Sequence, residues 1–308
     1  MAGLRIGIDL GGSKIEGWAI PIGAASPKPL ARRRIASPRG DYAATVDAVR
    51  GLVETLEAEA GGRGTVGVGI PGAISPATGL VKNANSTWLI GKPFDDDLSA
   101  ALGRPVRMTN DANCLALSEA VDGAGAGARV VFGAILGTGV GGGLAIDGRP
   151  LTGANAIAGE WGHNPLPRPR DDERPGPDCY CGRRGCIETF LSGPGLARDY
   201  EAASGEALSA EAIENRAESG EAEARAALAR HAERLARALA SVVNVVDPDV
   251  IVLGGGLSQI AELCDAVTAQ WAEHIFSDTV ATKLTVATHG DASGVRGAAW
   301  LWTEDEAG

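Results

Sequence analysis

Residues 4–14 read LRIGIDLGGSK, and this stretch predicts how the fold begins. Its first seven residues are typical of a buried strand that ends in a carboxylate at Asp9. A Gly-Gly-Ser turn follows, and residues 15–20 predict a second strand. A strand, a glycine tip and a returning strand together make a β-hairpin.

The same arrangement returns in the second half of the chain. Residues 130–136 predict a strand, Gly137-Thr138-Gly139 a turn, and residues 143–146 a returning strand. Residues 137–142 match the GxGxxG pattern of dinucleotide-binding folds, but that motif requires a helix after its glycines. Here the glycines lead into a strand and a turn, so we reject the dinucleotide fold and expect a second phosphate-binding hairpin.

Helices and further strands accompany these hairpins. Residues 41–60 carry apolar side chains at helical spacing between a capping Asp41 and the pair Gly61-Gly62. The other expected elements are a strand at 65–70, an irregular surface loop at 166–178, a helix at about 221–246 and a buried strand at 249–253. Two related α/β halves that face a cleft are the simplest architecture for this pattern.

Three glycine turns at strand ends indicate a phosphate site. Glycines let phosphate oxygens approach backbone N–H donors, and Asp9 can hold Mg²⁺ through water. We therefore expect nucleotide contacts in the first turn and in the second, while the third could flank an adenosine. The residues are Asp9, Gly11, Gly12, Ser13 and Lys14, then Gly137, Thr138 and Gly139, then Gly254, Gly255 and Gly256. A plain hairpin is the alternative for the first turn, and a solvated ammonium is an equal alternative for Lys14.

Asn110 and Asp111 follow a strand-like segment at 106–108. An aspartate at the mouth of a cleft can accept the proton of an attacking hydroxyl. An aspartate at this point can equally cap the N-terminus of a helix. The local sequence leaves both roles open.

A cluster of thiols predicts a metal site. Cys179, Cys181 and Cys186, with His163, make a Cys₃His set that suits structural zinc. Cys179 and Cys181 are too close in sequence for an unstrained mutual disulfide. Free thiols, a disulfide and an ordinary loop histidine are the alternatives. The nearby carboxylates Glu160 and Glu188 suggest a metal-stapled wall of a binding site, with acidic groups that face a polar ligand.

Composition narrows the classes of function. The chain has 308 residues, 44% of them hydrophobic, and a net charge of −11, which is enough for two domains and disfavours nucleic-acid binding. The basic run at 32–34 is short and reads as a solvated strand edge. No apolar run approaches the ~18 residues of a membrane helix, and no signal peptide is recognisable. Five cysteines without a disulfide framework suggest a cytoplasmic protein.

Taken together, these motifs resemble the ROK family of bacterial sugar kinases and repressors. The similarity covers essentially the whole chain, and the strings CxCGxxGCxE at 179–188 and GExGH at 159–163 are highly specific to it. It implies an α/β, actin/hexokinase-like (ribonuclease H-like) ATPase fold with two α/β domains flanking a cleft. We expect a small domain of residues 1–112 with 291–308 and a large domain of residues 113–290.

The resemblance also implies roles for single residues. Asp111 would be the general base, and Asn110, Glu160, His163 and Glu188 would bind sugar hydroxyls. Gly11, Gly12, Thr138 and Gly139 would line the phosphates of ATP. Structural zinc would be held by His163, Cys179, Cys181 and Cys186, with the second ring nitrogen of the histidine free for sugar. Ser13 stands where many relatives have threonine, which keeps the hydroxyl.

Within the family the segments 74–88, 159–167 and 290–302 are most similar to bacterial fructokinase (manno(fructo)kinase). We therefore predict ATP- and Mg²⁺-dependent conversion of D-fructose to fructose 6-phosphate. Asn85 and Trp88 are weaker candidates for tuning sugar choice. The alternatives are a kinase for mannose, glucose or N-acetylglucosamine, and a non-catalytic sugar-sensing protein. A repressor is disfavoured because the first strand begins at about residue 4. The resemblance further suggests a homodimer.

Overall fold

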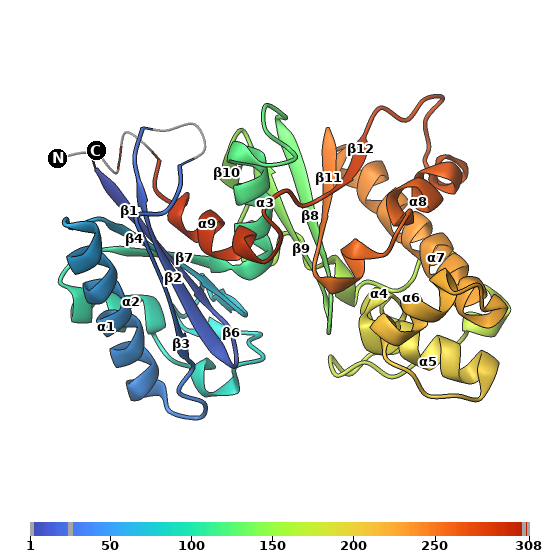
Figure 1. Ribbon diagram of the computed structural model, residues 1–308, viewed down its shortest axis with the longest axis horizontal. Coiled ribbons are helices and arrows are strands. Elements are labelled where there is room, and N and C mark those ends of the chain that lie inside the picture. The colour runs from blue at the N-terminus through green and yellow to red at the C-terminus, as the bar shows by residue number, and fades with distance from the viewer. Residues whose placement is uncertain (1–2, 24–26, 304–305, 307–308) are drawn as a thin grey trace. The chain divides into compact units, whose positions relative to one another are not determined.

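The computed structural model describes residues 3–23, 27–303 and 306 (Figure 1). The chain forms two compact units. The first contains the residues up to Gly127, residues 143–158 and the residues from Thr288 onward, and the second contains residues 128–142 and 159–287. Within the described residues, no helix combines the length and apolarity that a membrane crossing requires.

The first unit is built on a five-stranded sheet with the order β3-β2-β1-β4-β7. Strand β1 pairs antiparallel with β2 and parallel with β4, and β4 pairs parallel with β7. The predicted hairpin and the strand at 65–70 are therefore confirmed. The bounds are β1 Leu4–Leu10, β2 Lys14–Pro21, β3 Ala31–Ala36, β4 Thr65–Ile70 and β7 Val106–Asn110, with a small ribbon of β5 Ala73–Ile74 and β6 Val81–Lys82.

Helices cover both faces of this sheet. Figure 1 shows α1 (Tyr42–Ala60) and α2 (Phe94–Leu102) on one face, and α3 (Asp111–Asp122) and α9 (Ser293–Ala299) on the other. Helix α1 begins at Asp41, whose side chain accepts a hydrogen bond from the Ala44 N–H at 3.0 Å, and ends at Gly61 in the left-handed conformation. Both predicted ends of this helix are thus confirmed.

Two glycines bring α9 close to the sheet. A Cβ on Gly7 of β1 would lie 2.1 Å from the carbonyl oxygen of Val295, and one on Gly67 of β4 would lie 1.8 Å from that of Ala298. No real Cβ occupies such space, so these positions accept glycine alone. The backbone of α9 consequently packs directly on β1 and β4.

The second sheet repeats the strand order of the first as β10-β9-β8-β11-β12. The chain passes from one unit to the other within β9, at residue 143. Strand β9 begins at Val140, directly after the glycine turn, so the rejection of a dinucleotide fold is confirmed. The bounds are β8 Val130–Leu136, β9 Val140–Ile146, β10 Arg149–Pro150, β11 Val250–Gly254 and β12 Lys283–Val286.

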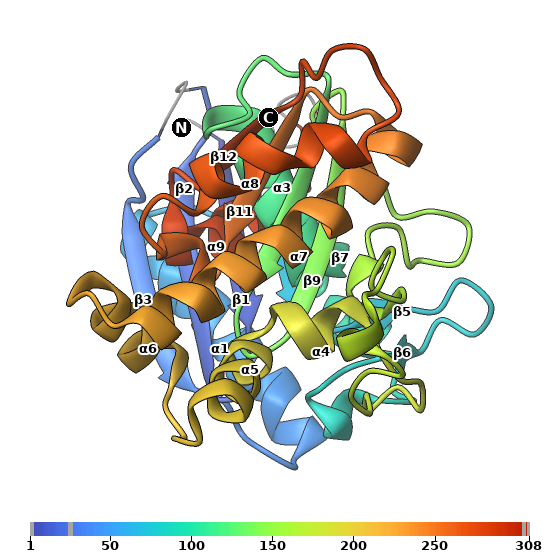
Figure 2. The same ribbon diagram turned by 90° about the vertical axis from the view of Figure 1, so that its right-hand side faces the viewer.

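The helices of the second unit lie in the stretch after residue 186. Figures 1 and 2 show α7 and α8 along one face of the strands β8 and β11. The long helix predicted at about 221–246 is confirmed as α7. The helices are α4 Ile187–Leu191, α5 Gly193–Ser204, α6 Ala210–Glu218, α7 Ala222–Val246 and α8 Leu263–Trp271, and the short 3₁₀ turns of the chain are η1 Thr87–Leu89, η2 Trp161–His163, η3 Asp171–Glu173, η4 Gly256–Gln259, η5 Ala272–His274 and η6 Gly290–Ala292.

The two units differ from the expected domains mainly at α3. The sequence-based division after residue 112 would cut this helix near its start, whereas the structure groups all of α3 with the first unit. The reason is a close helix contact, since a Cβ on Gly297 of α9 would lie 1.8 Å from the carbonyl oxygen of Cys114. Residues 143–158 join this unit too, and the Leu144 N–H donates to Asn113 Oδ1 at 3.2 Å.

The loop predicted at 166–178 is irregular, but it is not simply a surface loop. Glu173 is buried and accepts hydrogen bonds at 2.8 Å from both Arg234 and Arg237 of α7. Burial alone would raise the pKa of Glu173, but the two arginines outweigh it and lower that pKa to about 2. The loop is therefore fastened to α7 by buried ion pairs.

Candidate functional site

The first unit gathers carboxylates at one edge of its sheet. Strands β1, β4 and β7 are parallel, so their carboxyl ends meet at the same edge. Asp9 is the penultimate residue of β1, and Asp111 directly follows β7. Burial and the negative charges of Asp111 and Glu16 raise the pKa of Asp9 to about 7. Carboxylates that repel one another in this way suit a divalent cation.

Small residues leave room for the Asp9 side chain. A Cβ on Gly294 would lie 3.1 Å from Asp9 Cγ, and one on Gly69 of the neighbouring strand would lie 3.0 Å from Cys114 Sγ. Cys114 is fully buried, and burial followed by the charges of Asp9 and Asp111 raises the pKa of its thiol. Cys114 is therefore a neutral packing group beside the carboxylates.

Asn110 and Asp111 lie at the N-terminus of α3. Asn110 occupies the N-cap position, and its side-chain oxygen accepts a hydrogen bond from the Ala112 N–H at 2.8 Å. Asp111 is the first helical residue, and its Oδ1 lies 2.7 Å from the same nitrogen. Asn110 is thus the N-cap residue, and Asp111 Oδ1 accepts a hydrogen bond from the same N–H.

The turn between β1 and β2 is closed by its own backbone. The Gly11 N–H donates to the Lys14 carbonyl at 2.9 Å, so this N–H serves the turn. The Gly12 carbonyl accepts from Arg39 Nε at 2.8 Å, while Ser13 and Lys14 are exposed at the tip.

The two residues suggested to tune sugar choice differ in exposure. Trp88 packs against the core and donates its indole N–H to Thr45 at 3.0 Å, whereas Asn85 is exposed.

The turn between β8 and β9 is held from outside as well. The Gly137 N–H donates to the Gly139 carbonyl at 2.9 Å, and the Gly137 carbonyl accepts from the Gly193 N–H at 2.8 Å. The Val140 N–H donates to Glu188 Oε2 at 2.9 Å. A Cβ on Gly139 would lie 2.6 Å from that oxygen, so the glycine allows the carboxylate to approach.

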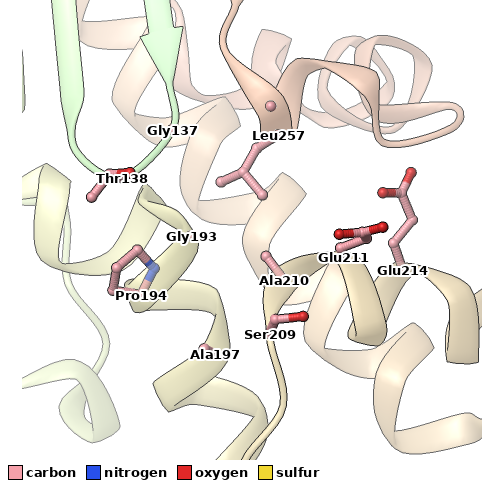
Figure 3. Close-up of a pocket in the computed structure, with 11 residues that line it drawn as sticks. Gly137, Thr138, Gly193, Pro194, Ala197, Ser209, Ala210, Glu211, Glu214 and Leu257 are labelled. Atoms are coloured by element: carbon pink, nitrogen blue, oxygen red, sulfur yellow. The ribbon is translucent and has the colours of Figure 1, made fainter. Parts of the chain in front are cut away.

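A cavity of about 710 Å³ opens beside this second turn (Figure 3). Figure 3 shows the β8–β9 turn at one end, Leu257 and Pro194 at the wall, and the carboxylates of Glu211 and Glu214 on α6 at the other end. The third glycine turn reaches the cavity through Gly256. The lining residues are Gly137, Thr138, Gly193, Pro194, Ala197, Ser209, Ala210, Glu211, Glu214, Gly256 and Leu257.

The glycine rim of this cavity was predictable from the sequence, but the rest of its lining was not. Gly255 has a φ of 82°, and a Cβ there would lie 2.4 Å from the Leu136 carbonyl oxygen, so the third turn requires glycine. The missed residues lie at the starts of α5 and α6. Ser192 and Ser209 cap those helices, which is a signal for helix starts and not for a ligand.

The predicted metal ligands come together in the second unit. The ligand atoms of His163, Cys179, Cys181 and Cys186 all lie within 4.8 Å of one another. The distance from His163 Nδ1 to Cys179 Sγ and that from Cys181 Sγ to Cys186 Sγ are both 3.6 Å. Zinc bonds of about 2.0–2.3 Å in a tetrahedron require ligand separations of roughly 3.5–3.8 Å, and these two separations meet that requirement.

The thiols of this set are not tied up in disulfides. All five cysteines, which lie within the described ranges, are free. Burial raises the pKa of Cys179 and of Cys186. Buried thiolates need a neighbouring cation, which a metal ion would supply.

Tyr180, which no sequence motif singled out, contacts the histidine of this cluster. Tyr180 Oη lies 2.9 Å from His163 Nε2, the ring nitrogen expected to face sugar. Burial of the hydroxyl, followed by the charges of Glu188, Cys179 and Glu160, raises the pKa of Tyr180 to about 12. The Tyr180 hydroxyl thus contacts His163 and lies within the electrostatic influence of Glu188 and Glu160.

Comparisons with known proteins agree over nearly the full chain. The model that describes the ROK family matches residues 5–305. An N-acetyl-D-glucosamine kinase from Salmonella typhimurium is 40% identical over 303 residues, which are 97% of this chain and 99% of the relative. A ROK hexokinase from Thermus thermophilus is similar in structure, with 30% identity, a TM-score of 0.85 and 97% of each chain covered. A ROK family glucokinase from Streptomyces griseus, solved with glucose and AMPPNP, shares 28% identity over 97% of this chain and 99% of its own, with a TM-score of 0.78.

Proposed function

The chain belongs to the ROK family, and we propose that it is a kinase that transfers the terminal phosphoryl group of ATP to a hydroxyl of a hexose. The observation that carries the proposal is the cavity beside the β8–β9 turn, which combines a glycine turn with an apolar wall. The kinase names of relatives at 40% and 30% identity support the same reaction class.

The cavity suits a nucleoside triphosphate. Gly137 and Thr138 would face the phosphates, because a glycine turn lets phosphate oxygens come close to the backbone. Leu257 and Pro194 would contact the base, as apolar pocket walls commonly do. Glu211 and Glu214 would accept hydrogen bonds from the ribose hydroxyls, since ionised carboxylates are acceptors.

The acidic edge of the first unit suits the chemical step. Asp111 would accept the proton of the attacking hydroxyl as the new P–O bond forms. Asp9, whose pKa is raised to about 7 by burial and then by the neighbouring carboxylates, would hold Mg²⁺ through water. When bound, Mg²⁺ supplies positive charge to the phosphate oxygens.

The wall around Tyr180 suits the hexose. Glu160 and Glu188 would accept hydrogen bonds from sugar hydroxyls. His163 would bind the metal through Nδ1, and its Nε2 would bind a sugar hydroxyl in place of the Tyr180 hydroxyl that it contacts in this structure. Zinc is the proposed occupant of the Cys₃His set, where it would fix the loop that carries these groups. Asn110 would add a contact through its amide.

Two hexoses are the main candidates for the phosphoryl acceptor. The segments 74–88, 159–167 and 290–302 favour D-fructose, with fructose 6-phosphate as product. The relatives at 40% identity are named for N-acetyl-D-glucosamine, which favours that sugar instead. One or two side-chain contacts decide among such substrates. The cytoplasmic location and the homodimer remain predictions.

The test is ADP release by the purified protein with Mg-ATP and fructose, N-acetylglucosamine, glucose or mannose. Turnover with fructose well above the other three supports the fructokinase assignment. A preference for N-acetylglucosamine keeps the reaction and replaces the acceptor. Absence of turnover with all four sugars, while a sugar still binds in calorimetry, would overturn the kinase proposal in favour of a sugar-binding protein.

A further inference from the structure

Two parts of the second unit that would bind different substrates are joined by one side chain. Glu188 belongs to the wall proposed for the hexose, and its Oε2 accepts a hydrogen bond from the Val140 N–H at 2.9 Å. Val140 directly follows the turn whose Thr138 lines the cavity proposed for ATP. A carboxylate has two oxygens, so this bond leaves acceptor capacity for a sugar hydroxyl.

The contact is tight on both sides. Gly139 lies so close to Glu188 that an added Cβ would be 2.6 Å from Oε2. Glu188 stands in the first turn of α4, two residues after the predicted metal ligand Cys186, which is the N-cap of that helix. The Ile187 N–H donates to the Asn164 carbonyl at 2.8 Å, which fixes the same helix start to the segment after His163.

The segment between Glu160 and His163 packs on the strand that follows the turn. The Trp161 indole N–H donates to the Gly141 carbonyl at 2.8 Å. A Cβ on Gly162 would lie 2.0 Å from the Val140 carbonyl oxygen, so η2 packs against the strand without space between them. The segment that carries Glu160 and His163 and the start of β9 therefore pack closely within the second unit.

We propose that Glu188 is a positioning residue that couples the two substrates: a hexose bound to its carboxylate fixes the phosphate-binding turn, and so tightens the binding of ATP. This coupling rests on the proposed function. Linkage requires that it acts equally in both directions, so ATP tightens hexose binding by the same factor. The physical basis is the shared carboxylate, which holds the Val140 N–H while it binds the sugar.

The experiment measures Mg-AMPPNP affinity by calorimetry, with and without the hexose that the wild type phosphorylates. Glu188→Ala removes the acceptor, and Glu188→Gln keeps an oxygen that can accept from the Val140 N–H. Glu201→Ala, on the exposed face of α5, is the matched control for the loss of one negative charge in the same unit.

In the wild type the hexose is expected to tighten AMPPNP binding by about fivefold or more. Glu188→Ala should weaken AMPPNP binding about fivefold to tenfold without hexose and bring the coupling factor close to one. Glu188→Gln should stay within about twofold of the wild type for AMPPNP alone, a rescue that a general loss of structure would not give. The control Glu201→Ala should match the wild type throughout.

A second variant approaches the contact from the other side and serves where Glu188→Ala does not fold. Gly139→Ala crowds the Glu188 carboxylate, and we expect it to weaken hexose binding several-fold in the absence of any nucleotide. Unchanged hexose affinity in this variant, or equal AMPPNP affinity and coupling in Glu188→Ala and the wild type, overturns the inference. A wild type that binds AMPPNP and phosphorylates a hexose keeps the proposed function in either case, whereas one that does neither refutes both.

Discussion

The two glycine hairpins occupy the same place in their sheets and differ in one decisive residue. In the first sheet Asp9 pairs with Gly69 of the neighbouring parallel strand, and in the second sheet Ile135 pairs with Gly254. Each of these residues is followed by Leu-Gly and then by the tip of its turn. The first hairpin therefore ends in a carboxylate where the second ends in an aliphatic side chain.

This difference separates the chemistry of the two hairpins. The first lies among Asp9, Glu16 and Asp111, whose mutual repulsion favours a cation. The second has no acid within its strand end, and its backbone faces a cavity and is held by Glu188. The same supersecondary unit thus serves, in our proposal, a metal ion and a proton acceptor in one half and phosphate oxygens in the other.

The largest effect is expected when Asp111, beside the first hairpin, is replaced. Asp111→Ala should lower turnover by about 10²- to 10⁴-fold, because the proton acceptor is lost. Hexose affinity, measured by calorimetry, should change little. Asp47→Ala on the exposed face of α1 is the control, and near-normal ADP release by Asp111→Ala would refute the base assignment.

Asp9→Asn tests the cation side of the first hairpin. Turnover should fall about 100-fold or more, whereas the folded state should gain stability. The folded pKa of Asp9 is about 7, above its ordinary value of 3.8, so the folded state binds the proton more tightly than the unfolded chain. The stability of the wild type therefore falls as pH rises from about 4 to 7.

The gain from Asp9→Asn should accordingly be small near pH 4 and largest above pH 7. Because the side chain is partly exposed, we expect about 1–2 kcal/mol there, well below what three pKa units alone would give. Thermal melts between pH 4 and 8 provide the measurement. A stability gain that does not depend on pH would contradict the raised pKa of Asp9.

Metal removal tests whether the Cys₃His cluster stabilises the proposed hexose wall, which contacts the second hairpin through Glu188. Cys181→Ser should abolish stoichiometric zinc, lower the melting temperature by about 3–6 °C and weaken hexose binding about tenfold. The matched control is Cys264→Ser, which lies in the same unit outside the cluster. Chelation that strips the metal without any change in stability or hexose affinity would show that the cluster does not fasten the wall.

The smallest effect is expected at the proposed ribose site, in the cavity beside the second hairpin. Glu211→Ala should raise the KM for ATP about threefold to tenfold with little change in kcat, because an acceptor for a ribose hydroxyl is lost. Glu218→Ala, exposed on the same helix, should behave as the wild type. A KM for ATP that stays constant in Glu211→Ala would remove the carboxylate from the proposed ribose site.

Local chemistry explains what could be predicted from the sequence. The hairpins, the capped ends of α1 and the glycine turns depend on neighbouring residues, and these predictions are confirmed. The Cys₃His set was also predictable, because three of its members lie within eight residues and His163 belongs to a specific string. The assignment of α3 to the first unit depends instead on a contact with α9, which no local pattern reveals.

Long-range partners explain the rest. The burial of Glu173 requires two arginines about 60 residues away on α7, so the loop alone looked solvated. The Tyr180 hydroxyl contacts His163, which is 17 residues away, and the Trp88 indole N–H donates to Thr45, which is 43 residues away. The wall of the cavity combines the starts of α5 and α6 with η4, and neither start carries a ligand signature.

The packing of α9 also bears on how the chain is made in the cell. Strands β1 and β4 leave the ribosome early, yet the helix that fits against Gly7 and Gly67 is formed by residues 293–299. The last residue of the second unit is Ala287, so this unit can fold before α9 has been synthesised and packed on the first sheet. A nascent or prematurely terminated chain that lacks α9 would expose this apolar face to chaperones and proteases.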